Sequence, residues 1–185
     1  MSYFPMCVDL TNQNVYLVGS GRQIAEKAEK LAPFGANLMQ KDSFTQQDAE
    51  TLPALVIVGD EAPAEEIFAL CRRYRIPVNT VDRPALCTFF FPALARQGDL
   101  TVSVSTGGKS PGFAGCLRQA LEEVIPERSG EILRWLEGLR VEIKAAHSPS
   151  DSRRILQRAT RQSFALGRPL VPEEMEAILA EEAPV

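Results

Sequence analysis

The sequence predicts an α/β fold that begins with a doubly wound parallel sheet and continues into a small hairpin and several helices. Two observations support this prediction. Apolar runs of strand length alternate with helical patterns through the first half of the chain, which is the order of βαβ units. Two glycines, Gly19 and Gly21, fall where the first predicted strand meets the first predicted helix. The alternation stops near residue 92, after which helical patterns dominate.

The first strand, turn and helix span residues 15–36. Residues 15–18 are apolar or aromatic, which favours a strand buried on both faces, and apolar residues after Gly21 recur at helical spacing. Because a helix N-terminus favours an anion, we expect this turn to hold the pyrophosphate of a dinucleotide. The expected cofactor-binding residues of the turn are Gly19, Ser20, Gly21, Arg22, Gln23 and Ile24.

Two departures from the dinucleotide fingerprint leave a second interpretation open. The fingerprint has Gly or Ala where this chain has Ile24, and it has an acidic residue where the second strand ends in Met39-Gln40-Lys41. The competing interpretation is an ordinary tight turn without a ligand.

Three further strands are predicted in the first half of the chain. They are expected at 36–39, 55–60 and 77–82. Apolar residues from Ala64 to Cys71 recur at helical spacing, which predicts a helix that reaches about residue 74. The polar residues 42–51 show no strand pattern.

Ligands of open α/β sheets bind at the carboxyl ends of the strands. We therefore expect Gly59 and Asp60, which end the third strand, to lie near the cofactor. Asp82 ends the fourth strand, and a positioned carboxylate there would remove a proton during an oxidation. The alternative is that Asp82 only caps the turn at the strand end, with Arg83 as a surface partner.

A hairpin and four helices are predicted in the second half. The hairpin would pair residues 88–94 with 100–105 across a polar turn. Ser110 is a suitable N-cap and Pro111 a suitable first residue of the next helix, which Pro126 ends. The remaining helices are expected at 131–146, 155–166 and 172–180.

Composition argues against several classes of protein. The net charge of −4 argues against a nucleic-acid surface, and no apolar run is long enough to span a bilayer. We expect no signal peptide, since the N-terminus lacks a basic start and a long apolar stretch. The four cysteines form no CxxC pair and the only histidine is His147. We therefore expect reduced thiols, a cytoplasmic location and no metal-ligand set.

Three stretches together resemble a known family. They are VYLVGSGRQIAEKAEKL near the start, VNTVDRPALCTFFFPALARQGDLTVSVSTGGKSPGFAGCLRQALEE in the middle, and the helical tail. The middle stretch is the most specific, because Asn-x-x-Asp, Leu-Cys-x-Phe-x-Phe-Pro and Ser-Thr-Gly-Gly-Lys-Ser-Pro follow one another in it. The whole chain resembles the bifunctional precorrin-2 dehydrogenase/sirohydrochlorin ferrochelatase family, including the N-terminal half of siroheme synthase.

The resemblance implies an activity, a cofactor and an assembly. The implied reaction is NAD-dependent oxidation of precorrin-2 to sirohydrochlorin in siroheme or cobalamin biosynthesis, sometimes followed by metal insertion. The implied assembly is a homodimer. The expected domains are an NAD-binding Rossmann-like domain at 1–91, a dimerisation segment at 92–125 and a helical C-terminal domain at 126–185. Phe89, Phe90 and Phe91 are expected in the sheet core or at the dimer contact, with tetrapyrrole stacking as the alternative.

The tetrapyrrole substrate of this family carries many carboxylates, and the turn after the hairpin offers them N–H donors, a lysine and a helix N-terminus. The expected substrate-binding residues are Asn79, Ser105, Thr106, Gly107, Gly108, Lys109 and Ser110. Alternatively, this turn is a well-capped β–α connection with a solvated Lys109, and Asn79 orients a loop or ends a strand. Asp82 matches the aspartate to which the family's chemistry is assigned. His147 is expected in a solvated linker.

The turn of this family is usually Gly-Gly-Gly with Ala or Gly further in, whereas this chain has Ser20 and Ile24. Two rival functions follow from these departures. One is a degenerate, non-catalytic accessory protein that holds a tetrapyrrole. The other is a chelatase alone, which would need Asp82 but not the glycine turn.

Overall fold

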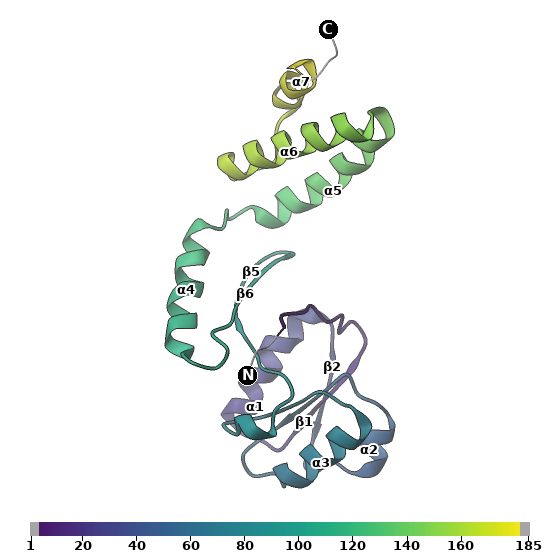
Figure 1. Ribbon diagram of the computed structural model, residues 1–185, viewed down its shortest axis with the longest axis vertical. Coiled ribbons are helices and arrows are strands. Elements are labelled where there is room, and N and C mark those ends of the chain that lie inside the picture. Colours follow the sequence, from purple (N-terminus) through teal and green to yellow (C-terminus); the bar gives the residue numbers. More distant parts are fainter. Residues whose placement is uncertain (1–3, 182–185) are drawn as a thin grey trace. The chain divides into compact units, whose positions relative to one another are not determined.

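The computed structural model describes residues 4–181, which divide into two compact units between Phe91 and Pro92 (Figure 1). The first unit, residues 4–91, contains a parallel sheet with helices on both faces. The second unit, residues 92–181, contains a two-stranded hairpin and four helices.

The sheet of the first unit has the strand order β2-β1-β3-β4, with all pairs parallel. Its strands are β1 (Asn14–Val18), β2 (Asn37–Lys41), β3 (Leu55–Val58) and β4 (Val78–Thr80). The chain runs from β1 outward to β2 and then returns to place β3 on the other side of β1. The gap between the carboxyl ends of β1 and β3 is therefore the topological switch point at which such sheets bind ligands.

Helices cover both faces of this sheet. They are α1 (Arg22–Leu31), η1 (Ala32–Phe34), α2 (Gln46–Glu50), α3 (Ala64–Tyr74) and η2 (Pro84–Leu86). Alternate strand residues face opposite sides: Val15 and Leu17 pack in the core under α1, whereas Tyr16 and Val18 pack with residues of α2 and α3. Burial on both faces explains why residues 15–18 of β1 and the whole of β3 are uninterrupted apolar or aromatic runs, whereas β2 at the sheet edge is more exposed and more polar.

The polar residues 42–51 contain no strand, as expected, but they form the short helix α2. Its start is fixed by a capping box, in which the Thr45 side chain accepts from the Asp48 N–H and the Asp48 carboxylate accepts from the Thr45 N–H. Asp48 also forms an ion pair with Lys41 at the end of β2. The Thr-x-x-Asp pattern is the sequence signal for this helix start.

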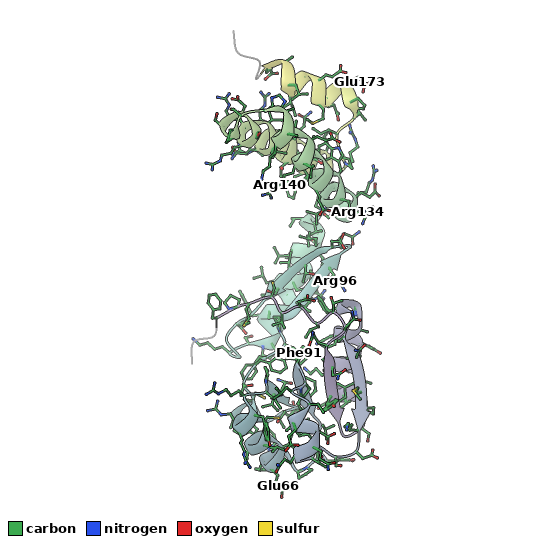
Figure 2. All side chains as sticks on the ribbon, turned by 90° about the vertical axis from the view of Figure 1, so that its right-hand side faces the viewer. Glu66, Phe91, Arg96, Arg134, Arg140 and Glu173 are labelled. Atoms are coloured by element: carbon green, nitrogen blue, oxygen red, sulfur yellow. The ribbon has the colours of Figure 1, made fainter. Side chains whose placement is uncertain are left out.

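In the second unit, β5 (Ala93–Gln97) and β6 (Leu100–Val104) form an antiparallel hairpin. It is followed by α4 (Pro111–Val124), α5 (Ser129–Ala146), α6 (Pro149–Leu166) and α7 (Pro172–Glu181). Leu139, Ile155 and Ile178 join α5, α6 and α7 in one core. Arg134 on α5, labelled in Figure 2, lies 3.6 Å from the Asp99 carboxylate in the hairpin turn, and both side chains are exposed.

The predicted strand at 88–94 is wrong. The hairpin starts only at Ala93, and its turn is confined to Gly98 and Asp99. Phe89 and Phe91 instead pack against the core of the first unit, with their ring centroids 5.4 Å apart. These aromatic residues therefore close the first core and do not continue the hairpin.

The predicted fold class is confirmed: a Rossmann-like parallel sheet with flanking helices, a small antiparallel sheet and a helical C-terminal part. The predicted helix with Ser110 as N-cap and Pro111 first is also confirmed. The division of the chain into domains at 1–91, 92–125 and 126–185 stays a prediction, and residues 1–3 and 182–185 lie outside the described residues. Within 4–181, no helix is both long and apolar enough to cross a membrane.

Candidate cofactor and catalytic site

The glycine turn after β1 is fixed between the ends of its two neighbouring strands. The Gly19 N–H donates to the Lys41 carbonyl at the end of β2, and the Gly59 N–H after β3 donates to the Val18 carbonyl, both at 2.9 Å. In addition, the Gln40 side-chain amide donates to the Gly19 carbonyl. The turn therefore lies at the switch point of the sheet.

The conformation of this turn suits a dinucleotide pyrophosphate. Gly19 and Gly21 have φ of 94° and 99°, which L side chains rarely adopt. A Cβ added at Gly21 would have no atom within 4 Å, so the space beside the turn is open. Among the described residues, no side chain caps α1 and its first turn has no acidic residue. The N–H groups and the dipole of α1 are thus available to an anion.

Ile24 does not block this turn. Its side chain is 3% exposed and packs inward with Leu17 and Ile57 in the core under α1. The room for it comes from Gly59, because a Cβ there would lie 3.2 Å from Ile24 Cγ1. The bulky residue at the third fingerprint position is therefore accommodated inside the sheet–helix interface and leaves the ligand side clear.

Asp82, which follows β4, reaches the N-terminal turn of α1. Its Oδ2 accepts a hydrogen bond of 2.8 Å from Nε2 of Gln23. Asp82 is exposed and has φ of 52°, in the left-handed region that aspartate tolerates. The structure thus brings together the glycine turn and the carboxylate, two of the features singled out in the sequence.

Lys27 is a further residue near this carboxylate, and no pattern in the sequence indicates it. It lies one helical turn after Gln23, and its ammonium sits 4.6 Å from the centroid of the Phe91 ring. Burial lowers the pKa of Lys27, while the charge of Asp82 acts in the opposite direction. Arg83 is turned elsewhere, because its guanidinium binds Glu65 on α3.

Asn79 on β4 is buried, and its side chain binds the loop that follows β4. Its Nδ2 donates to the Phe89 carbonyl at 3.0 Å and lies 3.6 Å from Sγ of Cys87. The Cys87 thiol donates to the Thr80 carbonyl, and burial raises the pKa of this thiol. These contacts match the loop-orienting role considered for Asn79.

Lys41, at the end of β2, is engaged within the protein. It pairs with Asp48, and its ammonium lies 4.8 Å from the centroid of the Tyr16 ring. Asp60 is exposed after Gly59. The end of β2 thus offers the side chain of Gln40, and not a cation, to the region beside the glycine turn.

The candidate substrate turn of the second unit is partly closed on itself. The Thr106 hydroxyl accepts from the Ser110 N–H and donates to the Ser110 carbonyl, both at 3.1 Å, and the Ser110 hydroxyl caps α4 through the Phe113 N–H. The Gly107 N–H bonds the Ser105 hydroxyl at 3.3 Å. Lys109 is exposed and has no ion-pair partner among the described residues. Lys109 and the backbone around Gly108 are therefore the outward-facing part of this turn.

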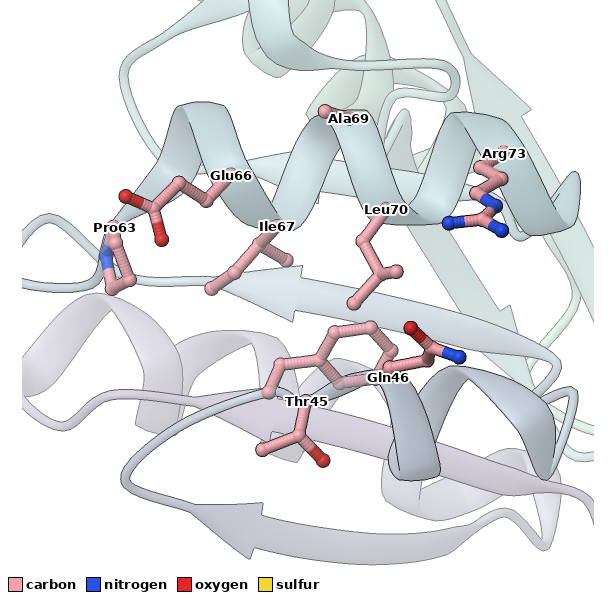
Figure 3. Close-up of a pocket in the computed structure, with 9 residues that line it drawn as sticks. Thr45, Gln46, Pro63, Glu66, Ile67, Ala69, Leu70 and Arg73 are labelled. Atoms are coloured by element: carbon pink, nitrogen blue, oxygen red, sulfur yellow. The ribbon is translucent and has the colours of Figure 1, made fainter.

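The other polar features of the described residues contribute nothing further to this site. Residues 4–181 contain no group of three or more His, Cys, Asp or Glu that would hold a metal ion. His147 ends α5 and is exposed. A groove of about 350 Å³ lies between α2 and α3 (Figure 3). It is lined by Phe44, Thr45, Gln46, Pro63, Glu66, Ile67, Ala69, Leu70 and Arg73, none of which belongs to the glycine turn or the Asp82 loop.

The fold and the site define the class of the first unit: an α/β domain of the dinucleotide-binding type. Residues 38–93 match the family model described as putative NAD(P)-binding, and residues 97–123 match the model described as sirohaem biosynthesis protein central. A nicotinamide cofactor is the ligand class that the first match supports.

Comparison with known proteins gives the particular relationship. Siroheme synthases from Thiobacillus denitrificans, Nitrosomonas eutropha and Methylococcus capsulatus are 30%, 32% and 31% identical over 89%, 83% and 99% of this chain. The chain is a relative of the siroheme synthases, and its resemblance to the precorrin-2 dehydrogenase/sirohydrochlorin ferrochelatase family is confirmed. It spans 39%, 37% and 44% of the lengths of these three relatives.

A solved structure, "SirC, precorrin-2 dehydrogenase", shares the fold. It matches 97% of this chain and 98% of its own with a TM-score of 0.66 at 18% sequence identity. At that identity the likeness shows the fold alone.

Proposed function

We propose that the protein is an NAD-dependent precorrin-2 dehydrogenase, which forms sirohydrochlorin in siroheme or cobalamin biosynthesis. The observation that supports this most strongly is the hydrogen bond from Gln23 to Asp82, because it places a carboxylate beside the helix N-terminus that would seat the cofactor. The names of the relatives and of the structure that shares the fold point to the same pathway.

Cofactor binding and proton removal fall to different groups of the first unit. The N–H groups around Gly19, Ser20 and Gly21 hold the pyrophosphate, and the bound nicotinamide supplies the hydride acceptor. The oxidation removes a hydride and a proton from the substrate, and Asp82 accepts the proton. If a metal is inserted afterwards, two pyrrole protons leave as the metal enters, and the exposed Asp82 carboxylate accepts them one at a time and passes each to solvent.

The substrate is a tetrapyrrole with several carboxylates. We infer that Lys109 and the backbone N–H of Gly108 bind some of these carboxylates, because they face outward from their turn. The Gly107 N–H, in contrast, already donates to the Ser105 hydroxyl. The hydroxyls of Thr106 and Ser110 act indirectly by closing the turn. Asn79 acts by holding the loop that carries Asp82.

We further infer that the protein forms a homodimer through α4 and works in the cytoplasm. Phe113, Leu117 and Val124 lie on one face of α4 and are 64%, 41% and 63% exposed. A second copy offers an equally apolar helix, and pairing two such faces removes them from water. The free cysteines Cys7, Cys71, Cys87 and Cys116 suit a reducing compartment.

The test is the conversion of precorrin-2 by the purified protein with NAD, followed by the absorbance of sirohydrochlorin, together with calorimetric titration of NAD. We expect NAD binding and product formation that requires both compounds. NAD binding without oxidation, or tetrapyrrole binding without NAD binding, would favour the accessory protein. Metal insertion into sirohydrochlorin without NAD binding would favour the chelatase.

A further inference from the structure

The side chain of Gln23 connects two parts of the site that are distant in sequence. Gln23 lies in the first turn of α1, directly after the glycine turn, and its Nε2 donates to Oδ2 of Asp82, 59 residues further along the chain. The backbone of Gln23 is therefore part of the helix N-terminus at which we propose the cofactor binds, and its side chain binds the Asp82 carboxylate.

This hydrogen bond fixes a carboxylate whose backbone is unusual. Asp82 has φ of 52°, and within residues 4–181 its side chain accepts a hydrogen bond from the side chain of Gln23. Three charged or titratable side chains lie on the elements around Asp82. Lys27 on α1 attracts it, Arg83 is bound to Glu65 on α3, and the Cys87 thiol donates to the Thr80 carbonyl.

A glutamine suits this position for a chemical reason. Its amide donates to one oxygen, Oδ2, and leaves Oδ1 of Asp82 accessible for a proton from a substrate. A lysine or arginine there would add a positive charge that favours the charged carboxylate over the protonated one. A glutamate would repel Asp82. A neutral donor orients the carboxylate without adding charge.

We propose that Gln23 is a positioning residue, whose side chain holds the Asp82 carboxylate in a fixed orientation relative to the cofactor-binding site at the first turn of α1. This inference rests on the proposed function and assigns to Gln23 a role in orienting the proton acceptor. Loss of the side chain would leave the N–H groups of the turn in place and release the carboxylate. The expected effect is therefore on kcat and not on cofactor affinity.

The test is a double-mutant cycle in the full chain with Gln23→Ala, Asp82→Asn and the double variant. We expect Gln23→Ala to lower kcat about tenfold, because misplacing a catalytic group by an ångström costs one to two orders of magnitude. The KM for precorrin-2 and the Kd for NAD should stay within about twofold of wild type. In the Asp82→Asn background the same substitution should have no further effect.

The matched control is Gln46→Ala, because Gln46 also donates from an exposed helical side chain to a carboxylate, that of Glu50, at 2.8 Å. Its kcat should equal that of the wild type. Two results would overturn the positioning role if the wild type is active. One is a kcat of Gln23→Ala equal to that of the wild type. The other is a fall in kcat on Gln23→Ala that is the same in the wild-type and Asp82→Asn backgrounds. An inactive wild type would instead overturn the proposed function.

A second readout does not depend on activity. In the cofactor-free protein, the side-chain amide resonances of Gln23, assigned with Gln23→Ala, should move when Asp82 is replaced by alanine. The resonances of Gln46 should not move. Unmoved Gln23 resonances would show that the hydrogen bond is absent, and the proposal would fail on structural grounds.

Discussion

Ile24 fills the space that a side chain at Gly59 would need. A Cβ on Gly59 would lie 3.2 Å from Ile24 Cγ1 and 3.4 Å from the Val18 carbonyl oxygen. In the dinucleotide fingerprint, a small residue on the helix allows the helix and the sheet to approach closely. Here the helix carries the large residue and the strand end carries the glycine, so the close approach is kept with the two sizes exchanged.

This relationship predicts a coupled effect on stability. Gly59→Ala should lower the free energy of unfolding by about 1–3 kcal/mol, because the added methyl overpacks the interface. Ile24→Ala alone should lower it by about 2–5 kcal/mol through the cavity that it leaves. In the Ile24→Ala background, however, the Gly59→Ala change should lose most of its effect. Urea denaturation of the four proteins measures this coupling.

The control for this cycle is Gly138→Ala on α5, where an added Cβ meets no atom within 4 Å. That change should raise the free energy of unfolding by about 0.5–1 kcal/mol, as expected for a helical glycine. Equal destabilisation by Gly59→Ala in the wild-type and Ile24→Ala backgrounds would contradict the interpretation that Ile24 fills the space beside Gly59.

A negative charge in the glycine turn should separate cofactor binding from stability. Ser20 is exposed beside the N-terminus of α1. Ser20→Asp should weaken NAD binding on the order of tenfold or more, because like charges a few ångströms apart repel by about 1–4 kcal/mol. The same change should leave stability equal or slightly higher, since acids favour helix N-termini. Calorimetry and urea denaturation measure the two effects.

The exposed Ser43 provides the control for this prediction. Ser43→Asp adds the same charge outside the glycine turn and should leave NAD affinity within about twofold of wild type. Equal NAD affinity in Ser20→Asp and wild type would show that the pyrophosphate does not bind at this turn.

The ion pair between Lys41 and Asp48 should make stability depend on pH. Burial raises the pKa of Asp48, but the hydrogen bonds from Lys41 and Thr45 outweigh it and hold the pKa below 3.8. A carboxyl with a lowered pKa in the folded state stabilises the protein above its unfolded-state pKa, and this contribution is lost as pH falls through the folded-state value. Asp48→Asn should therefore destabilise the protein at pH 7, and the difference from wild type should shrink below pH 3.8.

Urea midpoints of both proteins across this range provide the measurement. The hydrogen bond to Asp48 also raises the pKa of Lys41 above 10.5, so its contribution should persist to at least that pH and be lost above it. A difference between the two proteins that is constant from pH 7 to below pH 3 would contradict the ion-pair account.

The apolar face of α4 predicts the effect of a charge on assembly. Leu117→Lys should convert a dimer into a monomer, because the charge would be buried without a partner in the paired faces. Gln119, on the opposite face of α4 and exposed, is the control, and Gln119→Lys should leave the dimer intact. Sedimentation velocity measures both. A wild-type monomer, or a Leu117→Lys dimer, would contradict the proposed interface.

The sequence predicts the elements that are strongly periodic or capped by specific residues. The buried strands, α1, α3 and the Ser110–Pro111 start of α4 occur where the patterns place them. The prediction of a strand at 88–94 is wrong because Phe89 and Phe91 are apolar for another reason, which is that they pack against the core of the first unit. Apolar spacing alone does not distinguish a strand from a loop that packs against a core.

Only part of the site can be predicted from the sequence, because some of its contacts join segments that are distant along the chain. The glycine turn and Asp82 carry local signals, because one is a strand–helix junction and the other a strand end. The pairing of Gln23 with Asp82 and of Ile24 with Gly59 depends on which strand ends become neighbours. That information comes from the sheet order β2-β1-β3-β4 and not from any single segment.

The most direct measurement is the rate of NAD-dependent sirohydrochlorin formation by wild type and by Asp82→Asn, with NAD affinity measured on both. We expect the variant to turn over roughly a hundredfold or more slowly, as for loss of a general base, with an NAD dissociation constant within about twofold of wild type. Equal turnover by the two proteins would contradict the account, because the carboxylate beside the glycine turn would then take no part in the oxidation.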